Sequence, residues 1–299
     1  MRLFILLCIG LILFSCISLE PELEWEDVTS DHEPVLNIIA LLSSDSLTKS
    51  FVKVHRSLTI DEQQDTLVRD TLESGEIIIY YASKFVVKDA VVKINDGVKE
   101  YEFEYLEDDM SEYDTVSTGF YYYDGDDLIP QPGELWTLSV TTPGGFNVTG
   151  ETTIPSEPVI YKEELPETFQ LDQTMNISWQ PHPDNYQILN TGNLWYWNKT
   201  GCGLWQEEIV SPNEESFVFR REICGGDEEI QDSEGGELLL NLMSMDNNYF
   251  DYFIRYGEDP EFSSLFLGEG GSGRSFGIEG GIGIFGAVLF DRHVIPIVP

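Results

Sequence analysis

Hydrophobic and polar positions alternate over short stretches of this chain, as they do along β-strands that bury one face. The clearest case pairs residues 90–94 with residues 101–105 around Asn95-Asp96-Gly97, where glycine supplies the positive φ that a hairpin turn needs. Long helical periodicity is absent from the sequence, and Pro, Gly, Asn and Asp recur throughout. The pattern therefore predicts an all-β protein.

Further short strands are expected along the whole chain, separated by turns rich in proline and glycine. Before residue 156 they are residues 35–42, 51–55, 77–81, 119–123, 135–141 and 146–154. After it they are residues 175–179, 186–188 and 276–290. Residues 194–197, 216–220, 238–243 and 248–256 are each expected to form a strand or a short helix. About eight strands at this spacing predict an antiparallel sandwich in the first half. In the second half, a strand ending in Trp179, a proline turn and a strand led by Tyr186 resemble the start of a fibronectin type III sandwich.

The expected organisation is two antiparallel β-sandwich domains of the immunoglobulin or fibronectin III type behind a tether. Residues 34–155 form the N-terminal sandwich and residues 156–299 the C-terminal β-rich domain, because three prolines between 155 and 166 indicate a hinge. Residues 16–33 are acidic with few apolar side chains, so they bury too little surface to fold alone. They are interpreted as a solvated tether.

Four glycines interrupt the apolar stretch near the C-terminus, at positions 280, 281, 283 and 286. Glycine weakens a strand unless a bulge forms or another group must approach closely. We expect Ile282, Ile284 and Phe285 to pack into the second domain, with the glycines making room for bulky neighbours such as Trp195. The alternative is an exposed edge that docks a receptor.

The first 16 residues have the composition of an export signal. Arg2 precedes an apolar run over residues 3–14, and Ser15 stands directly before Cys16. This arrangement resembles a bacterial lipobox, in which cleavage removes residues 1–15 and Cys16 receives fatty acids such as palmitate. Phe14 departs from the stricter motif. The alternative is an uncleaved anchor, since residues 3–19 approach the length of a membrane span.

The chain is strongly acidic, with 54 acidic residues against 16 basic ones and a net charge of −38. Such a field repels nucleic acid, whose binding depends on neutralising phosphates. It also repels anionic membrane surfaces, so attachment to a membrane depends on the acyl chains. Solubility explains the charge most simply, and calcium or a cationic partner is the alternative.

Two cysteines remain in the expected mature chain besides Cys16, namely Cys202 and Cys224. In an oxidising compartment an even pair predicts a disulfide. Its loop of about 22 residues corresponds to a stabilisation on the order of 3 kcal/mol. Without a nearby histidine the pair supplies at most half of a zinc site.

Two further groups of residues are candidates for binding. Asp124, Asp126 and Asp127 gather around Gly125 and favour a structural calcium ion, although the EF-hand spacing is missing and a solvated turn is the alternative. Large rings alternate at Tyr121 and Tyr123 and again at Trp195 and Trp197. One face of such strands enters the core, which leaves the other face to stack on sugar or peptide. These four residues are candidate ligand contacts, with core packing as the alternative.

Motifs for catalysis are weak. The stretch Gly268 to Gly273 fits neither a nucleophile elbow nor a phosphate-binding loop, and the histidines lack metal-ligand spacing. We expect no enzyme and no cofactor other than calcium. A hydrolase with a carboxylate active site stays open, because paired carboxylates cannot be recognised among so many.

Several segments together resemble the domain-of-unknown-function 4249 family of Bacteroidota-type lipoproteins. They are residues 32–37, 41–45, 91–97, 132–138 and 151–155, and Gly280-Gly281-Ile282-Gly283-Ile284-Phe285-Gly286-Ala287. The resemblance covers nearly the whole mature chain, and similar proteins are often encoded beside TonB-dependent receptors. The resemblance itself attaches no activity to the chain. Together with the export signal it leads us to expect a non-enzymatic lipoprotein of the cell envelope, anchored in the outer membrane, that binds a protein or glycan as an accessory to such a receptor. The alternatives are a surface hydrolase and a purely structural or adhesive protein.

Overall fold

Buried and exposed side chains alternate along the strands, most regularly in β8 (Leu135–Thr141) and β9 (Asn147–Thr153). In β9 the residues Val148, Gly150 and Thr152 are buried, while their neighbours are exposed. The structure, a computed structural model, describes residues 33–45, 47–59, 62–63, 65–71, 77–107, 119–170, 172–193, 206–221, 236–256 and 273–298.

Most of the expected strands are present, so the mostly-β fold class is confirmed. Besides β8 and β9, the first half contains β1 (Leu36–Ser43), β2 (Phe51–Arg56), β3 (Asp65–Thr71), β4 (Ile77–Ser83), β5 (Val91–Asn95), β6 (Glu100–Glu107) and β7 (Gly119–Tyr122). The second half contains β10 (Phe169–Gln170), β11 (Thr174–Ser178), β12 (Tyr186–Asn193), β13 (Gln206–Val210), β14 (Ser216–Arg220), β15 (Gly236–Met245), β16 (Ser275–Phe276), β17 (Ile278–Glu279) and β18 (Ile282–Val298). The sequence pattern does not predict β3, β10 or β13.

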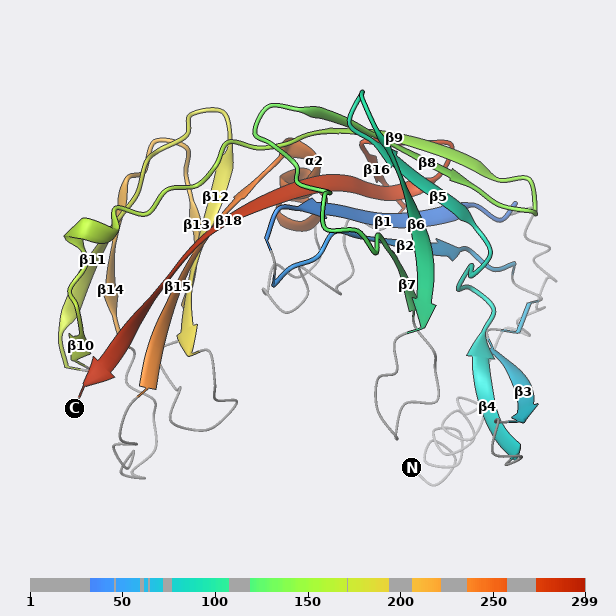
Figure 1. Ribbon diagram of the computed structural model, residues 1–299, viewed down its shortest axis with the longest axis horizontal. Helices are drawn as coiled ribbons and strands as arrows, with labels where there is room; N and C mark the ends of the chain where they lie inside the picture. Colours follow the sequence, from blue (N-terminus) through green and yellow to red (C-terminus); the bar gives the residue numbers. More distant parts are fainter. Residues whose placement is uncertain are drawn as a thin grey trace, which may run out of the picture. The chain divides into compact units, whose positions relative to one another are not determined.

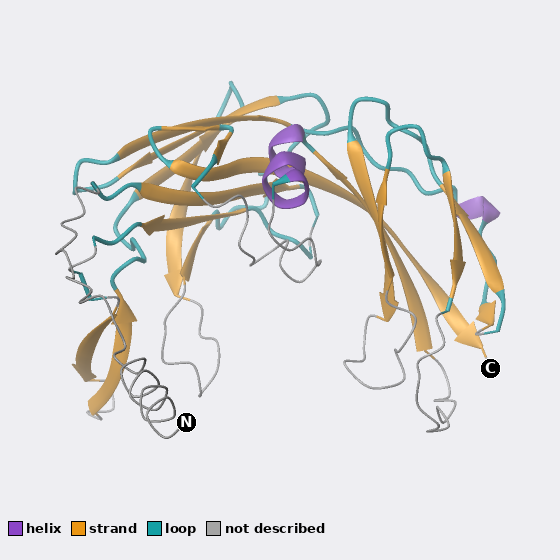
Figure 2. Cartoon of the chain, turned by 180° about the vertical axis from the view of Figure 1, so that it is seen from behind, coloured by secondary structure: helices purple, strands orange, loops and turns teal. Residues whose placement is uncertain are grey.

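Helical turns are short. A 3₁₀ turn, η1 (Lys162–Glu164), lies between the halves of the chain, and α2 (Asn247–Tyr249) continues into the π-helical η3 (Phe250–Arg255). Figure 2 shows α2 and η3 as one coil beside the strands of the sheet. The side chain of Asp246 caps this helix by accepting a hydrogen bond from the backbone N–H of Tyr249. Of the two forms open for residues 248–256, the structure contains the helix.

Within the described residues, fourteen strands form one mixed sheet. In this sheet β18 lies between β15 of the second half of the chain and β1 of the first half. The order along the sheet is β13-β12-β15-β18-β1-β2-β7-β6-β5-β8-β9-β17, with β10 and β16 also paired to β18. Residues 282–288 pair in parallel with β1, and residues 288–297 of the same strand pair antiparallel with β15. Figure 1 shows β18 passing alongside β1 and then alongside β15.

The parallel pairing of β1 with β18 corrects the expectation of a purely antiparallel arrangement. The two strands come from opposite ends of the described chain, so no tight turn forces them to run in opposite directions. The remaining pairs of β1, β2, β5, β6, β7, β8 and β9 with one another are antiparallel, as expected.

Two small sheets lie off the large one, β3 with β4 and β11 with β14. The strand β11, which resembles the start of a fibronectin type III sandwich, thus pairs with β14 rather than with β12. Trp179 follows β11 and is buried, and its indole N–H donates to the carbonyl oxygen of Glu214 at 2.9 Å.

Among the residues that the structure describes, the buried apolar side chains form three clusters. The first joins strands of the first half to Phe285, Ala287 and Leu289 of β18, and the second joins strands of the second half to Ile295. The third lies where α2 and η3 pack on the sheet and includes Ile284. By their contacts, Pro34–Pro299 form one unit.

The C-terminal glycine stretch differs in two respects from expectation. Ile284 and Phe285 are buried as expected, but Phe285 packs with the first half of the chain and not with the second. Gly283 lies against the backbone carbonyl of Ile38 and not against an aromatic ring. The parallel pairing with β1 explains both differences, because it carries this segment into the core of the first half.

Candidate functional site

Tyr121 is a core residue and not a ligand contact. It lies in β7 with 2 % of its surface exposed. Its hydroxyl donates to the carbonyl oxygen of Val87 at 2.8 Å and accepts from the backbone N–H of Ala90 at 3.0 Å. Burial raises the pKa of Tyr121 to about 12. The expectation that this ring is free to stack on a ligand is therefore wrong.

Tyr123, two residues further on, is half-buried, and its hydroxyl is held in a charged network. The hydroxyl donates to Oδ1 of Asp127 at 2.7 Å, and the ammonium of Lys99 donates to the other carboxylate oxygen. The same ammonium lies 3.3 Å from the Tyr123 hydroxyl and 4.6 Å from the ring centre of Tyr101. Hydrogen bonding to Asp127 raises the pKa of Lys99, and hydrogen bonding to Lys99 lowers the pKa of Asp127. The network fixes the ring of Tyr123 in one orientation.

The same network bears on the expected calcium ion. All three aspartates are exposed, and Asp127 has a lysine and a tyrosine as its partners. Among the residues that the structure describes, no three His, Cys, Asp or Glu side chains are grouped to hold a metal ion. Calcium binding at Asp124, Asp126 and Asp127 stays a prediction.

A cavity of about 510 Å³ lies between two turns, and we call it the Tyr123 pocket. The turn between β1 and β2 supplies Ser43, Ser44, Asp45, Lys49 and Ser50. The segment after β7 supplies Tyr123, Asp124, Gly125, Asp126, Leu128 and Ile129. The cavity thus brings one aromatic ring together with serine hydroxyls, charges of both signs and the side chain of Ile129, which is 56 % exposed.

The wall formed by the β1–β2 turn is ordered by hydrogen bonds of its own. The hydroxyl of Ser50 donates to the carbonyl oxygen of Ser43 at 3.1 Å and accepts from its N–H at 2.9 Å. The Asp45 carboxylate accepts from the backbone N–H groups of Leu47 and Thr48 at 3.1 and 2.8 Å. Such local side-chain bonds to the backbone are typical of stable turns.

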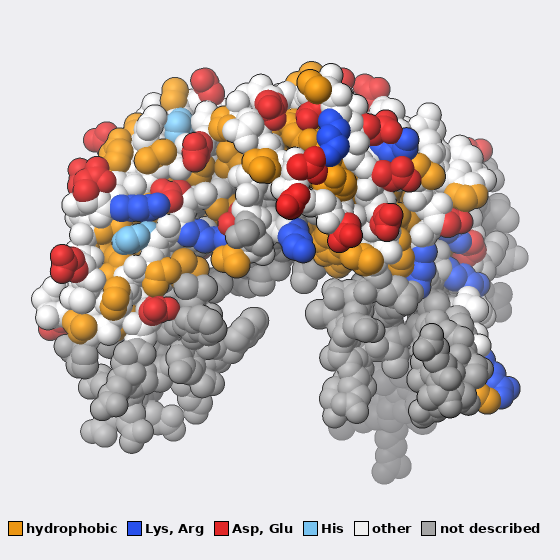
Figure 3. All heavy atoms as spheres, viewed as in Figure 1, with side chains coloured by type: hydrophobic (Ala, Val, Ile, Leu, Met, Phe, Trp, Pro, Cys, Tyr) orange, Lys and Arg blue, Asp and Glu red, His pale blue; other side chains and the backbone are white. Residues whose placement is uncertain are grey.

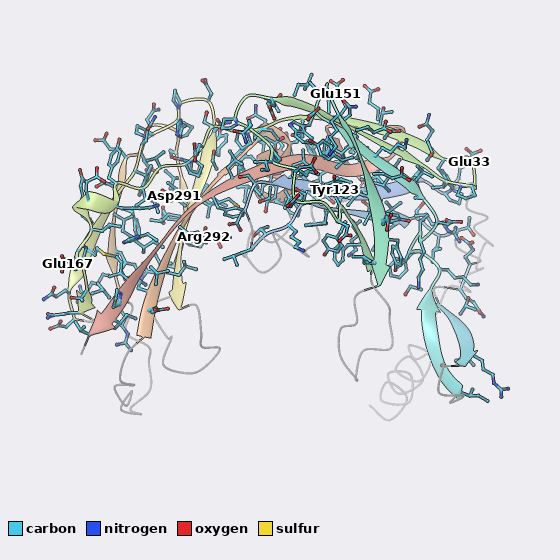
Figure 4. The ribbon with its side chains drawn as sticks, in the orientation of Figure 1. Glu33, Tyr123, Glu151, Glu167, Asp291 and Arg292 are labelled. Atoms are coloured by element: carbon cyan, nitrogen blue, oxygen red, sulfur yellow. The ribbon has the colours of Figure 1, made fainter. Side chains whose placement is uncertain are left out.

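Arg292 of β18 holds the same wall from the second half of the chain. Its guanidinium donates to the Asp45 carboxylate at 2.5 Å and to the Thr48 hydroxyl at 3.3 Å. Nε of Arg292 donates to the Asn241 side chain at 3.1 Å, and the guanidinium lies 4.6 Å from the ring centre of Phe290. Figure 4 labels Tyr123 and Arg292. Both partners of the Asp45 ion pair are largely buried, so solvent screens it less than a surface pair.

The sequence alone indicates only one wall of the pocket. Tyr123 and the aspartates that follow it were predicted as candidates from their residue types. Asp45 and Lys49 lie in a turn that is polar like any other turn. Arg292 has no local signal, because its partner Asp45 is 247 positions away.

The other predicted site residues lie outside the described part of the chain. They are Cys16, Cys202, Cys224, Trp195 and Trp197. Lipidation, the disulfide and the tryptophan contacts therefore stay predictions. No helix in the described ranges is both long enough and apolar enough to span a membrane. Figure 3 shows acidic, basic and apolar side chains interspersed over one face of the molecule.

A family model, described as "Domain of unknown function (DUF4249)", matches residues 22–292. The chain belongs to the DUF4249 family. The resemblance that the C-terminal glycine motif indicates is thereby confirmed. Both walls of the Tyr123 pocket and Arg292 lie within the matched residues, so in this DUF4249 chain the pocket is part of the family domain itself. A comparison with curated proteins gave no match.

Proposed function

We propose that this protein binds a polypeptide segment of a partner protein in the Tyr123 pocket. The observation that carries the proposal is a fixed tyrosine ring at a cavity of about 510 Å³ whose opposite wall is tied down by Arg292. Tyrosine supplies a large amphipathic contact surface with few rotatable bonds, and it is enriched among the residues that dominate binding energy.

The chemistry of the lining favours a polypeptide over other ligands. Lys49 complements a carboxylate, Asp124 and Asp126 complement a basic side chain, and Ser44 offers a hydroxyl to backbone amides. Leu128 and Ile129 add an apolar patch. A polypeptide carries all of these complementary groups within a few residues, including charges of both signs to pair with Lys49 and with the aspartates, whereas a neutral sugar offers only hydrogen bonds. A tightly held wall also lowers the entropy cost of binding.

The proposed setting is the outer membrane, with Cys16 acylated and residues 16–33 acting as a tether. The motif at residues 13–16 supports the anchor. The proposed partner is a TonB-dependent receptor, because proteins similar to the family are often encoded beside such receptors. The net charge of −38 supports a protein partner over nucleic acid.

A finer description of the fold is part of the proposal. We infer two immunoglobulin-like sandwich halves, residues 34–155 and 156–299, that share β18. Separate hydrophobic clusters in the two halves support this division. Arg292 on the shared strand β18 contacts Asp45 in the wall of the Tyr123 pocket. This contact supports a fixed position of the pocket relative to the second half.

Binding without catalysis is also proposed here. Asp127, the neighbour of the pocket residue Asp126, is paired with Lys99, and hydrogen bonding to this ammonium lowers its pKa. A general acid needs the opposite perturbation, a carboxyl that keeps its proton near neutral pH.

Affinity measurements on the full lipidated chain in detergent test the proposal. The titrant is a purified TonB-dependent receptor, the proposed class of partner. We expect Tyr123→Ala to weaken binding at least tenfold and Tyr161→Ala, a half-buried tyrosine outside the pocket, to leave it unchanged. Unchanged affinity in the Tyr123→Ala protein contradicts the proposal, as does turnover of an oligosaccharide or peptide panel by the purified protein.

A further inference from the structure

A second cavity, of about 590 Å³, is separate in its lining from the Tyr123 pocket. Four segments meet around it: the start of β8, the end of β9, the turn before β12 and the N-terminus of α2. Its lining consists of Gly133, Leu135, Glu151, Thr152, Thr153, Ile154, Ser156, Asp184, Asn185, Asp246, Asn247 and Asn248. The volume lies in the range of small-molecule sites. We propose that this junction cavity binds a neutral sugar.

The floor of the junction cavity is rigid. The buried carboxylate of Asp246 accepts hydrogen bonds from the Thr152 hydroxyl at 2.6 Å and from the backbone N–H groups of Tyr249 and Ala287 at 3.0 and 3.1 Å. These bonds tie the ends of β9 and β15, the helix and β18 to one residue. A ligand therefore meets a floor that is already ordered, which reduces the cost of binding.

Two amide side chains fix the sides of the cavity. The carboxamide of Asn248 donates to the carbonyl oxygens of Glu151 and Phe285 at 3.0 and 2.9 Å. The side-chain oxygen of Asn185 accepts from the backbone N–H of Ser156 at 3.0 Å. The segments that carry the lining thus hold each other in place through side chains on the cavity wall.

The exposed polar side chains of the junction cavity can form hydrogen bonds with the hydroxyl groups of a ligand. Glu151, Asp184 and Asn247 are all exposed, and Figure 4 labels Glu151 on β9. A carboxylate accepts from a hydroxyl group, and a carboxamide both donates and accepts, so the set matches a ligand whose hydroxyls do both. Leu135, 54 % exposed and directly across the β8–β9 pair from Thr153, adds an apolar contact for the C–H face of a sugar ring.

Charge narrows the ligand class further. The lining of the junction cavity includes three acidic residues, Glu151, Asp184 and Asp246, and no lysine or arginine, so an anionic ligand is repelled. A divalent metal lacks a site, since the described residues contain no group of three His, Cys, Asp or Glu side chains that could hold one. The carboxylate of Asp246 is already used by protein donors, which leaves less negative charge for an organic amine. A neutral sugar uses the hydrogen-bonding groups and the apolar patch together.

Calorimetric titration of the full chain tests this proposal. The probes are neutral di- and trisaccharides of gluco, manno, galacto and xylo configuration, with trigalacturonic acid and spermidine as charged comparisons. We expect at least one neutral probe to bind and the double variant Asp184→Ala/Asn247→Ala to weaken it at least tenfold. Asp172→Ala/Asn176→Ala changes the same residue types at exposed positions outside the cavity and is expected to leave the affinity unchanged.

Several outcomes overturn the proposal. They are no binding of any neutral probe, tighter binding of trigalacturonic acid or spermidine, and equal loss in the control variant. The Tyr123→Ala variant separates the two sites, because it removes a ring from the Tyr123 pocket and leaves the junction cavity intact. Loss of sugar binding in Tyr123→Ala together with normal binding in Asp184→Ala/Asn247→Ala assigns the sugar to the other pocket and overturns the inference.

Discussion

The carbonyl oxygen of Ile38 occupies the space that a side chain on Gly283 would need. A Cβ atom built on Gly283 lies 1.9 Å from that oxygen, far inside van der Waals contact. Gly283 also has a φ of +111°, a conformation that other residues adopt only with strain. The two residues are partners in the parallel pairing of β1 with β18, so the close approach is part of the sheet that joins both ends of the chain.

Gly283→Ala is expected to destabilise the fold by about 3 kcal/mol or more, because it adds a steric clash to backbone strain. Gly145→Ala is the matched control, since Gly145 has a φ of +88° but nothing within 4 Å of an added Cβ. The control should cost about 1–2 kcal/mol, the strain alone. Urea unfolding of both variants measures the difference. Equal losses would show that Ile38 and Gly283 do not approach this closely.

Phe285→Ala tests where the C-terminal glycine stretch packs. Phe285 is fully buried in the cluster of the first half, and its removal is expected to cost about 3–5 kcal/mol. Leu106→Ala, at a side chain that is 55 % exposed, should change the free energy of unfolding by less than about 1 kcal/mol. A Phe285→Ala protein with the wild-type melting temperature that fails to bind a partner would instead place this segment on a docking edge.

The buried carboxyl of Asp246 predicts a pH dependence of stability. Burial raises the pKa of Asp246 to about 6 from its ordinary 3.8, although hydrogen bonds from Thr152 and from backbone N–H groups oppose the change. The folded state therefore binds a proton more readily than the unfolded state. The stabilisation is fully present below pH 3.8 and is lost as the pH rises through 6, on the order of 2–3 kcal/mol.

Asp246→Asn isolates this contribution from the other carboxylates, because Asn has no proton to exchange over the same range. The free energy of unfolding of the wild type minus that of the variant should fall between pH 4 and pH 7. Chemical denaturation across that range measures it. A difference that is flat or that rises with pH would contradict the buried, proton-binding Asp246.

Cys16→Ser tests the anchor. If Cys16 is acylated, the variant should leave the membrane fraction and lose metabolic labelling with a fatty acid, since two or three acyl chains supply the membrane affinity. An unprocessed N-terminus with unchanged membrane fractionation would establish the uncleaved anchor instead.

Much of the fold follows from local pattern. Alternation marks β8 and β9, and Asn95-Asp96-Gly97 marks the turn between β5 and β6. The parallel pairing of β1 with β18 leaves no local mark, because it depends on contacts between the two ends of the described chain. The sequence pattern fails to predict β13 for a different reason. This edge strand carries adjacent glutamates and a half-exposed isoleucine, so it lacks a clear apolar face.

The candidate site was predictable only in part. The run Phe120 to Tyr123 identifies a ring-bearing strand, yet alternation alone does not say which ring enters the core. Tyr121 belongs to the first hydrophobic cluster, whereas Tyr123 is only partly buried against it. The ion pair of Lys99 with Asp127 forms only once β6 and the segment after β7 lie together. The opposite wall of the pocket is held by Arg292, which only the complete fold brings to Asp45, 247 positions away in the sequence.

Site-specific photo-crosslinking in intact cells tests the proposed binding of a partner in the Tyr123 pocket most directly. A photoreactive amino acid replaces Ile129, which lines the Tyr123 pocket and is 56 % exposed, or Val218, which is 63 % exposed on β14 and serves as the control. The account predicts an adduct with the TonB-dependent receptor from position 129, reduced by Tyr123→Ala, and none from position 218. No receptor adduct from position 129, or equal adducts from both positions, would contradict it.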